Sequence, residues 1–281
     1  MRRRAPLVIF ATLVVAGASS ALVAAQGTPP TVVVAAGARS TAIEGAEALR
    51  GGPVRIEYRS ASRRTNADLT LLALRPEIGE RELRAALLRN PDPRQAKRLG
   101  TFMGGADVPA SRARVQIVTV RPGTRYAVVN TRASSPRRWT TAFFTVGEGE
   151  SGAAAPEPVA TVTMRDYRFT APATLPRRGV IRVRNEGGRL HHAIAFRARE
   201  RGSARRAAAA LVRDDETAFA REVEPERFVA LQGITSGGTQ ADVQAAFART
   251  GRYVLVCFLE DGERGNPSHS TLGMVETFRV R

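Results

Sequence analysis

The C-terminal part of the chain gathers residue types that bind soft metal ions. Cys257 is the only cysteine among 281 residues, His269 is one of three histidines, and Met274 is one of four methionines. A thiolate and a thioether suit Cu(I), and an imidazole suits both common oxidation states of copper. The same residues also fit a metal-free protein, in which Cys257 is a buried thiol, His269 a loop residue and Met274 part of the core.

A pair of histidines lies upstream, at the start of the apolar stretch His-His-Ala-Ile-Ala-Phe. We predict a strand over 191–199 in which His192, Ile194 and Phe196 face the core. His191 then points to the opposite face, because side chains alternate along a strand. Two imidazoles, one thiolate and a weak thioether are the ligand set of a blue-copper centre. The order along the chain is His192, Cys257, His269, Met274, and these four residues are the predicted metal ligands.

Composition and motifs exclude several other functions. The formal net charge is +17, but the arginines are scattered, without a dense tract or interleaved aromatic residues, so we expect no nucleic-acid binding. The basic surface is compatible with an anionic surface of the cell envelope. No Gly-rich phosphate loop or zinc-protease motif is present. Three histidines are too few for a multicopper oxidase, and a two-copper centre would need a second cysteine. We therefore expect no enzymatic activity.

The N-terminus has the features of an export signal. Arg2, Arg3 and Arg4 precede the apolar segment 6–18, and small residues end at Ala25. We predict a signal peptide over residues 1–25; if it is not cleaved, its length also suits a membrane anchor. The protein is then extracellular, periplasmic or associated with the cell envelope. Cysteines usually pair there, so an unpaired thiol is buried, bridged to another molecule or bound to a metal.

The rest of the sequence reads as a duplication. A Pro- and Ala-rich linker over 147–158 separates a first domain, 27–146, from a second, 159–281. Both domains show the same order of signals: two strands, a helical stretch, a Gly-Gly pair, a strand-turn-strand unit and a last strand. The strands are 51–60, 66–74, 114–130 and 141–146 in the first domain and 177–188, 191–199, 242–257 and 275–280 in the second, with helices over 79–90 and 203–222.

These signals predict a mainly β fold. Short strands of period two, joined by turns and short helical insertions, are typical of an antiparallel β-sandwich. In the alignment of the two halves, Ala67 stands opposite His192 and Asn130 opposite Cys257. The first half has no histidine or methionine in its closing loop. The metal ligands are therefore expected in the second half only.

The second half resembles the cupredoxins, the blue-copper family that includes plastocyanin. The likeness rests on the turn over 185–188 before His192, on Gly251-Arg-Tyr253 leading into Cys257, and on the four residues between His269 and Met274, with a Gly-Met pair at the end. It covers roughly residues 158–281, and the first half resembles the same fold without ligands. The resemblance implies two Greek-key β-sandwich domains, one type 1-like copper in the second, single-electron transfer or copper holding, and a redox protein as partner.

One feature departs from the family pattern. Eleven residues separate Cys257 from His269, more than in typical members. Doubling the length of a loop costs only a fraction of ~1 kcal/mol in closure entropy, so the length alone does not exclude a metal site. We expect residues 260–265 to be polar and flexible. The alternative to a copper protein is a metal-free tandem β-sandwich that acts as a binding or scaffold module of the cell envelope.

Overall fold

The computed structural model describes residues 27–89, 97–200, 202–262 and 265–281. The predicted signal peptide, 1–25, lies outside the described residues. None of the described helices has the length and apolar character needed to span a bilayer. The described strands form two β-sheets, one of eight strands and one of nine.

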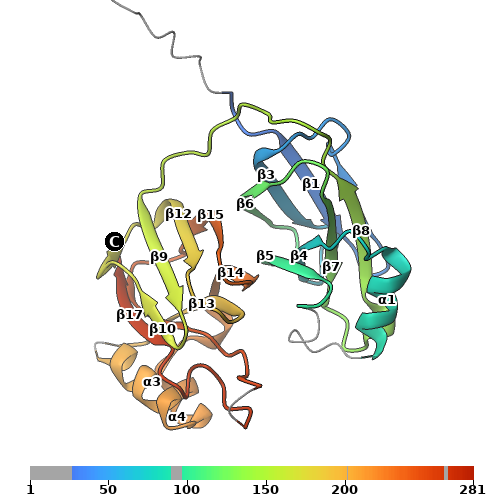
Figure 1. Ribbon diagram of the computed structural model, residues 1–281. Helices are drawn as coiled ribbons and strands as arrows, with labels where there is room; N and C mark the ends of the chain where they lie inside the picture. Colours follow the sequence, from blue (N-terminus) through green and yellow to red (C-terminus); the bar gives the residue numbers. More distant parts are fainter. Residues whose placement is uncertain (1–26, 90–96, 201, 263–264) are drawn as a thin grey trace, which may run out of the picture.

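Each half of the chain contributes a similar series of elements (Figure 1). The first half contains β1 (Thr31–Ala36), β2 (Thr41–Glu44), β3 (Gly52–Ser60), β4 (Ala67–Leu74), α1 (Glu80–Arg89), β5 (Gly100–Val108), β6 (Ala113–Val120), β7 (Arg125–Asn130), η1 (Pro136–Arg138) and β8 (Thr140–Thr145). The second half contains β9 (Ala160–Arg165), β10 (Arg168–Thr170), β11 (Thr174–Leu175), β12 (Arg178–Asn185), β13 (His191–Arg197), α3 (Ser203–Val212), α4 (Glu216–Glu222), η2 (Pro225–Arg227), β14 (Val229–Thr235), β15 (Thr239–Ala246), β16 (Gly251–Val256) and β17 (Val275–Val280).

The strand order shows the duplication directly. The eight-stranded sheet runs β10-β9-β12-β15-β6-β3-β1-β2, and the nine-stranded sheet runs β11-β17-β16-β13-β14-β5-β4-β7-β8. Outward from the centre, β6-β3-β1-β2 corresponds to β15-β12-β9-β10, and β5-β4-β7-β8 to β14-β13-β16-β17. The two halves are thus related by a local pseudo-two-fold axis. They meet edge to edge through the antiparallel pairs β6–β15 and β5–β14.

The mainly β, duplicated sandwich predicted from the sequence is therefore confirmed. The predicted linker runs between β8 and β9 (Figure 1). Both sheets continue across the two halves, so the limits of the two domains stay a prediction. Several strands were not predicted, among them β1, β5, β9 and β14. The two strands of each predicted strand-turn-strand unit, such as β6 and β7, lie in different sheets.

Each sandwich has its own core. In the first half, alternate residues of β3 and β4 are buried in one cluster, which includes Ile56, Tyr58 and Leu69. In the second half the core cluster includes Met274 together with Tyr253, Leu255 and Cys257, which alternate along β16 and the residue after it. Cys257 therefore points between the two sheets.

The predicted phase of β13 is wrong. His191, Ala193 and Ala195 are fully buried between the sheets, whereas His192 and Phe196 lie on the other face. On that face Phe196 packs against a second apolar cluster contributed by α3, α4 and β16. Because helices cover this side of the sheet, both faces of β13 are apolar. Hydrophobic alternation therefore does not distinguish the inner face from the outer one.

The predicted helix over 203–222 is two helices. Asp214 adopts a left-handed conformation with φ of 60°, which ends the first helix and is tolerated by aspartate. The side chain of Asp215 then accepts a hydrogen bond from the backbone N–H of Ala218 at 2.8 Å and caps α4. The acidic residues of this stretch thus include a helix cap, and both helices lie beside the lower end of the second sandwich (Figure 1).

Candidate metal centre

Three potential metal ligands meet in the core of the second half. His191 is the first residue of β13, Cys257 directly follows β16, and His269 lies in the loop before β17. The Nδ1 atoms of His191 and His269 are 3.2 Å apart, and Cys257 Sγ lies 3.5 Å from His269 Nδ1. The three ligand atoms are all within 4.8 Å of one another. At most 2% of any of these residues is exposed.

His192, the predicted first ligand, is not part of this cluster. Its ring points to the helix-covered face, where Nε2 accepts a hydrogen bond of 2.8 Å from the backbone N–H of Phe258. Its own backbone N–H points toward Cys257 Sγ at 3.5 Å. Burial lowers the pKa of His192 to about 3, which keeps this ring neutral and able to accept. His192 thus fixes the backbone around Cys257, and His191 occupies the place predicted for it.

A carboxylate orients the His191 ring. His191 Nε2 lies 3.1 Å from Asp166 Oδ1, which leaves Nδ1 directed at Cys257 and His269. Asp166 also accepts hydrogen bonds from the backbone N–H groups of Gly188 and Arg189. Metal-bound histidines commonly have such a partner on their second nitrogen, because it fixes the ring and its tautomer. Asp166 was not predicted from the sequence.

Burial opposes charge at these groups when no cation is present. It lowers the pKa of His191, although the neighbouring Asp166 acts in the opposite direction. It lowers the pKa of His269 to about 4 and raises that of the Cys257 thiol to about 12. Partial burial raises the pKa of Asp166, but the hydrogen bonds from His191, Gly188 and Arg189 outweigh it and hold the pKa below its usual value.

Met274, the predicted axial ligand, is tied to the same site through its backbone. Its N–H donates to the carbonyl of His269 at 2.8 Å, and its carbonyl accepts from the N–H of Cys257 at 3.3 Å. The side chain is fully buried in the core cluster that contains Cys257. Cys257, His269 and Met274 are thus held together by main-chain hydrogen bonds, whatever occupies the space between their side chains.

The long loop between Cys257 and His269 is a closed hairpin at its base. The N–H of His269 donates to the carbonyl of Leu259, and the N–H of Asp261 donates to that of Pro267, both at 2.8 Å. Glu260 and Ser268 form a bridge between these contacts. The extra residues therefore extend beyond this base, and His269 returns to Cys257.

Asp261 departs from the expectation that residues 260–265 are flexible; residues 263 and 264 of that range lie outside the described residues. Asp261 is 1% exposed. One carboxylate oxygen accepts a hydrogen bond from Tyr167 and the other an ion pair of 3.0 Å from Arg189. The guanidinium of Arg189 lies over the Tyr167 ring, and the Tyr167 ring meets His269 edge to face at 5.4 Å. We call Tyr167, Arg189 and Asp261 the loop clamp; no spacing signal in the sequence pairs these three residues.

The first half has the same strands without the cluster. Asn130, the counterpart of Cys257, is buried; its amide donates to the carbonyl of Gly37 at 3.2 Å, and its side-chain oxygen accepts from the N–H of Arg132. Ala67 is part of the core. Within the described ranges, the one group of three His, Cys, Asp or Glu residues close enough to share an ion is His191, Cys257 and His269.

No protein-family model and no curated protein matches the chain. Among solved structures it is similar to auracyanin B, with 20% identity over 46% of this chain and 93% of that one and a TM-score of 0.27. It is also similar to auracyanin A, a "blue" copper protein from Chloroflexus aurantiacus, with 16% identity over 43% of this chain and 99% of that one and a TM-score of 0.26. It is similar as well to a copper nitrite reductase from Nitrosomonas europaea, with 9% identity over 89% of this chain and 93% of that one and a TM-score of 0.25.

Two of these three structures are of copper proteins. At these identities and TM-scores, the assignment of the site rests on its own ligand atoms. Those atoms are two imidazole nitrogens and one thiol in a buried cluster.

Proposed function

We propose that the second half binds one copper ion in a type 1-like centre. His191, Cys257 and His269 supply the strong ligands, and Met274 supplies the weak axial one. The observation that carries the proposal is the convergence of His191 Nδ1, His269 Nδ1 and Cys257 Sγ within 4.8 Å in a buried cluster. Two imidazoles and a thiolate, with a distant thioether, are the ligand set of blue-copper sites.

The residues present fit such an ion. Ligand atoms bonded to a common metal at ~2.0–2.3 Å lie within ~4 Å of one another. The separations of 3.2 Å and 3.5 Å to His269 Nδ1 satisfy this limit, and the third separation, between the His191 and Cys257 ligand atoms, is at most 4.8 Å. A bound cation would also favour the thiolate at Cys257, which burial alone opposes. The backbone N–H groups of His192 and Leu259 donate toward that sulfur and favour the same charged form.

The surroundings support single-electron transfer or copper holding rather than an enzymatic reaction. Copper supplies a one-electron change between its two common oxidation states. Electron transfer is fast when ligands move little between these states, and here each strong ligand lies in a packed core or is fixed by hydrogen bonds. The proposal includes a redox protein as partner and, from the N-terminal signal, an exported location.

Reconstitution with Cu(II) tests the proposal. The purified protein should take up one copper per chain and show an intense visible band from thiolate-to-copper charge transfer. Cys257→Ser should abolish the band, and His191→Ala should abolish or strongly weaken it. His192→Asn is the matched control. The His192 ring does not face the cluster, so this variant should still bind one copper. A colourless protein without stoichiometric copper would refute the proposal.

The metal-free scaffold is the alternative that this experiment separates. It is favoured by the first half, which forms the same strands without a ligand cluster among its described residues. Under this alternative, copper and chelators leave the thermal unfolding temperature unchanged. Under the copper proposal, an ion that binds only the folded state raises that temperature, and the rise grows with the logarithm of the ion's concentration relative to its Kd.

A further inference from the structure

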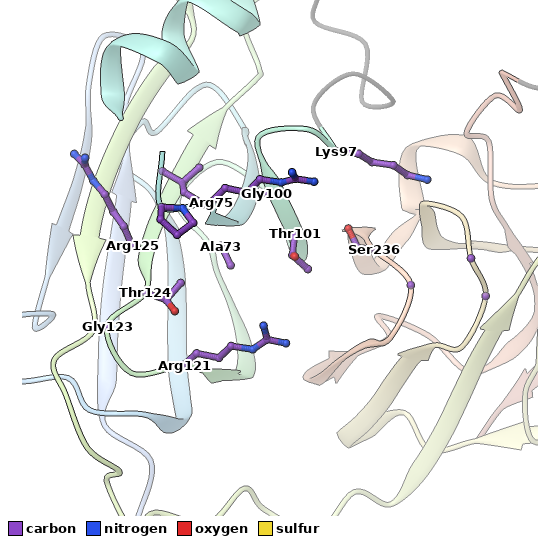
Figure 2. A pocket seen from close by; sticks show the side chains of 15 residues that line it. Ala73, Arg75, Lys97, Gly100, Thr101, Arg121, Gly123, Thr124, Arg125 and Ser236 are labelled. Atoms are coloured by element: carbon purple, nitrogen blue, oxygen red, sulfur yellow. The ribbon is translucent and has the colours of Figure 1, made fainter. Parts of the chain in front are cut away.

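A large cleft lies between the two halves (Figure 2). Its volume is about 900 Å³. The first half contributes the end of β4 with the residues after it, the start of β5, and the turn between β6 and β7. The second half contributes the turn between β12 and β13 and the turn between β14 and β15. None of the proposed copper ligands lines this space.

Among the residues that the structure describes, all charged side chains that line the cleft are cations: Arg75, Lys97, Arg121 and Arg125. Arg75, Lys97 and Arg121 extend into the space, whereas Arg125 points away from it (Figure 2) and lies over the ring of Phe143. Within the part of the chain that the structure describes, no carboxylate forms an ion pair with the first three. Cations that converge on a concave space without counter-charges attract anions.

The cleft is next to the candidate metal centre. One wall is the turn that contains Gly187 and Gly188, and a Cβ atom on Gly187 would lie only 3.1 Å from His191 Nε2. The N–H of Gly188 donates to Asp166, the carboxylate that orients His191.

The lining favours a small ligand over a protein surface. Pockets for small molecules have volumes of ~300–1,000 Å³, a range that includes this cleft. The centres of protein–protein interfaces are enriched in aromatic anchors, and none of the described residues that line the cleft is aromatic. A planar guanidinium binds carboxylate and phosphate groups in a two-pronged arrangement.

We propose that this cleft binds a small oxyanion with two or more negative charges, either a phosphate-bearing or a polycarboxylate ligand, beside the His191 edge of the metal centre. Arg75 and Arg121 bind the anionic groups from the first half, and Lys97 adds a third cation. Binding does not depend on copper. Only a change that the anion causes in the spectrum of the metal centre would require the copper proposal to be correct.

Calorimetric titration of the metal-free protein with inorganic pyrophosphate and with citrate, at constant ionic strength, tests the inference. At least one of them should bind at a single saturable site. A comparison of the Kd for pyrophosphate with the Kd for citrate distinguishes recognition of phosphate from recognition of carboxylate. In the double variant Arg75→Gln/Arg121→Gln the Kd should rise at least tenfold. Arg279→Gln, at an exposed position of β17 outside the cleft, is the matched control and should leave the Kd unchanged.

Three results would overturn the inference. The first is the absence of saturable binding of both anions. The second is an equal loss of affinity in the Arg279→Gln control, which would indicate non-specific attraction by a basic protein. The third is saturable binding of polyglutamate when both small anions fail, which would indicate an acidic polypeptide instead. Saturable binding to a protein that takes up no copper would support the cleft and refute only the copper proposal.

Discussion

His191 and His192 are neighbours in sequence but lie in different environments. The ring of His191 lies between the two sheets, bonded to Asp166 on one nitrogen and facing Cys257 and His269 with the other. The ring of His192 lies on the helix-covered face and accepts the N–H of Phe258. One backbone step therefore separates a candidate metal ligand from a positioning residue.

Replacing His192 should change the site without removing it. In His192→Ala the N–H of Phe258 loses its acceptor, and an unsatisfied buried donor costs about 1–3 kcal/mol. We expect the free energy of unfolding of the metal-free protein to fall by that amount, as measured by urea denaturation. The copper-loaded variant should keep one copper per chain with a shifted charge-transfer band. Complete loss of copper would show instead that His192 is itself a ligand.

At the scale of elements, the loop between Cys257 and His269 depends on contacts far away in sequence. Its base is a short hairpin, and Asp261 anchors it to Tyr167 in the β9–β10 turn and to Arg189 before β13. The loop clamp therefore connects the three segments that surround the site. This explains how eleven intervening residues are compatible with a separation of 3.5 Å between Cys257 Sγ and His269 Nδ1.

Breaking the loop clamp should loosen His269. In Asp261→Ala, Tyr167 and Arg189 lose a shared acceptor, and we expect a loss of about 1–3 kcal/mol in stability and a weaker affinity for copper. Competition with a chelator measures the affinity, and urea denaturation measures the stability. Glu260→Ala is the matched control, because Glu260 is the adjacent acidic residue and is exposed. Equal effects of the two substitutions would contradict the role assigned to the loop clamp.

At the scale of the whole molecule, the two halves form one pair of continuous sheets. Their contact at β5 and β14 is very close, because glycines occupy it: a Cβ on Gly104 would lie 2.0 Å from Gln232 Nε2 and 2.5 Å from Gln116 Nε2. Gly104 also has a positive φ of 102°. The cleft with its cations exists only because the halves meet in this way.

Adding a methyl group at this contact should destabilise the whole protein. Gly104→Ala should lower the unfolding temperature in calorimetry and separate the unfolding of the two halves. Gly149→Ala is the matched control: Gly149 also has a positive φ, 84°, but nothing lies within 4 Å of its added Cβ. A larger effect of Gly104→Ala than of Gly149→Ala isolates the contact from the backbone strain. Equal effects would show that the contact between the halves contributes little to stability.

Several features follow from the sequence alone, because they depend on local patterns. The alternation in 51–60 and 66–74 predicts buried strands, and β3 and β4 have that pattern. The two halves repeat the same signals, which predicts the duplication seen in the strand order. The rarity of cysteine and histidine, with the spacing of His269 and Met274, singles out the loop that carries the candidate site.

The tertiary structure decided what local patterns leave open. Both faces of β13 are apolar because α3 and α4 cover one of them, so only packing determines that His191 faces Cys257. The loop clamp and Asp166 join residues from separate segments, and such contacts have no periodic signal in the sequence. The basic cleft arises where two halves meet, so no single stretch of sequence could predict it.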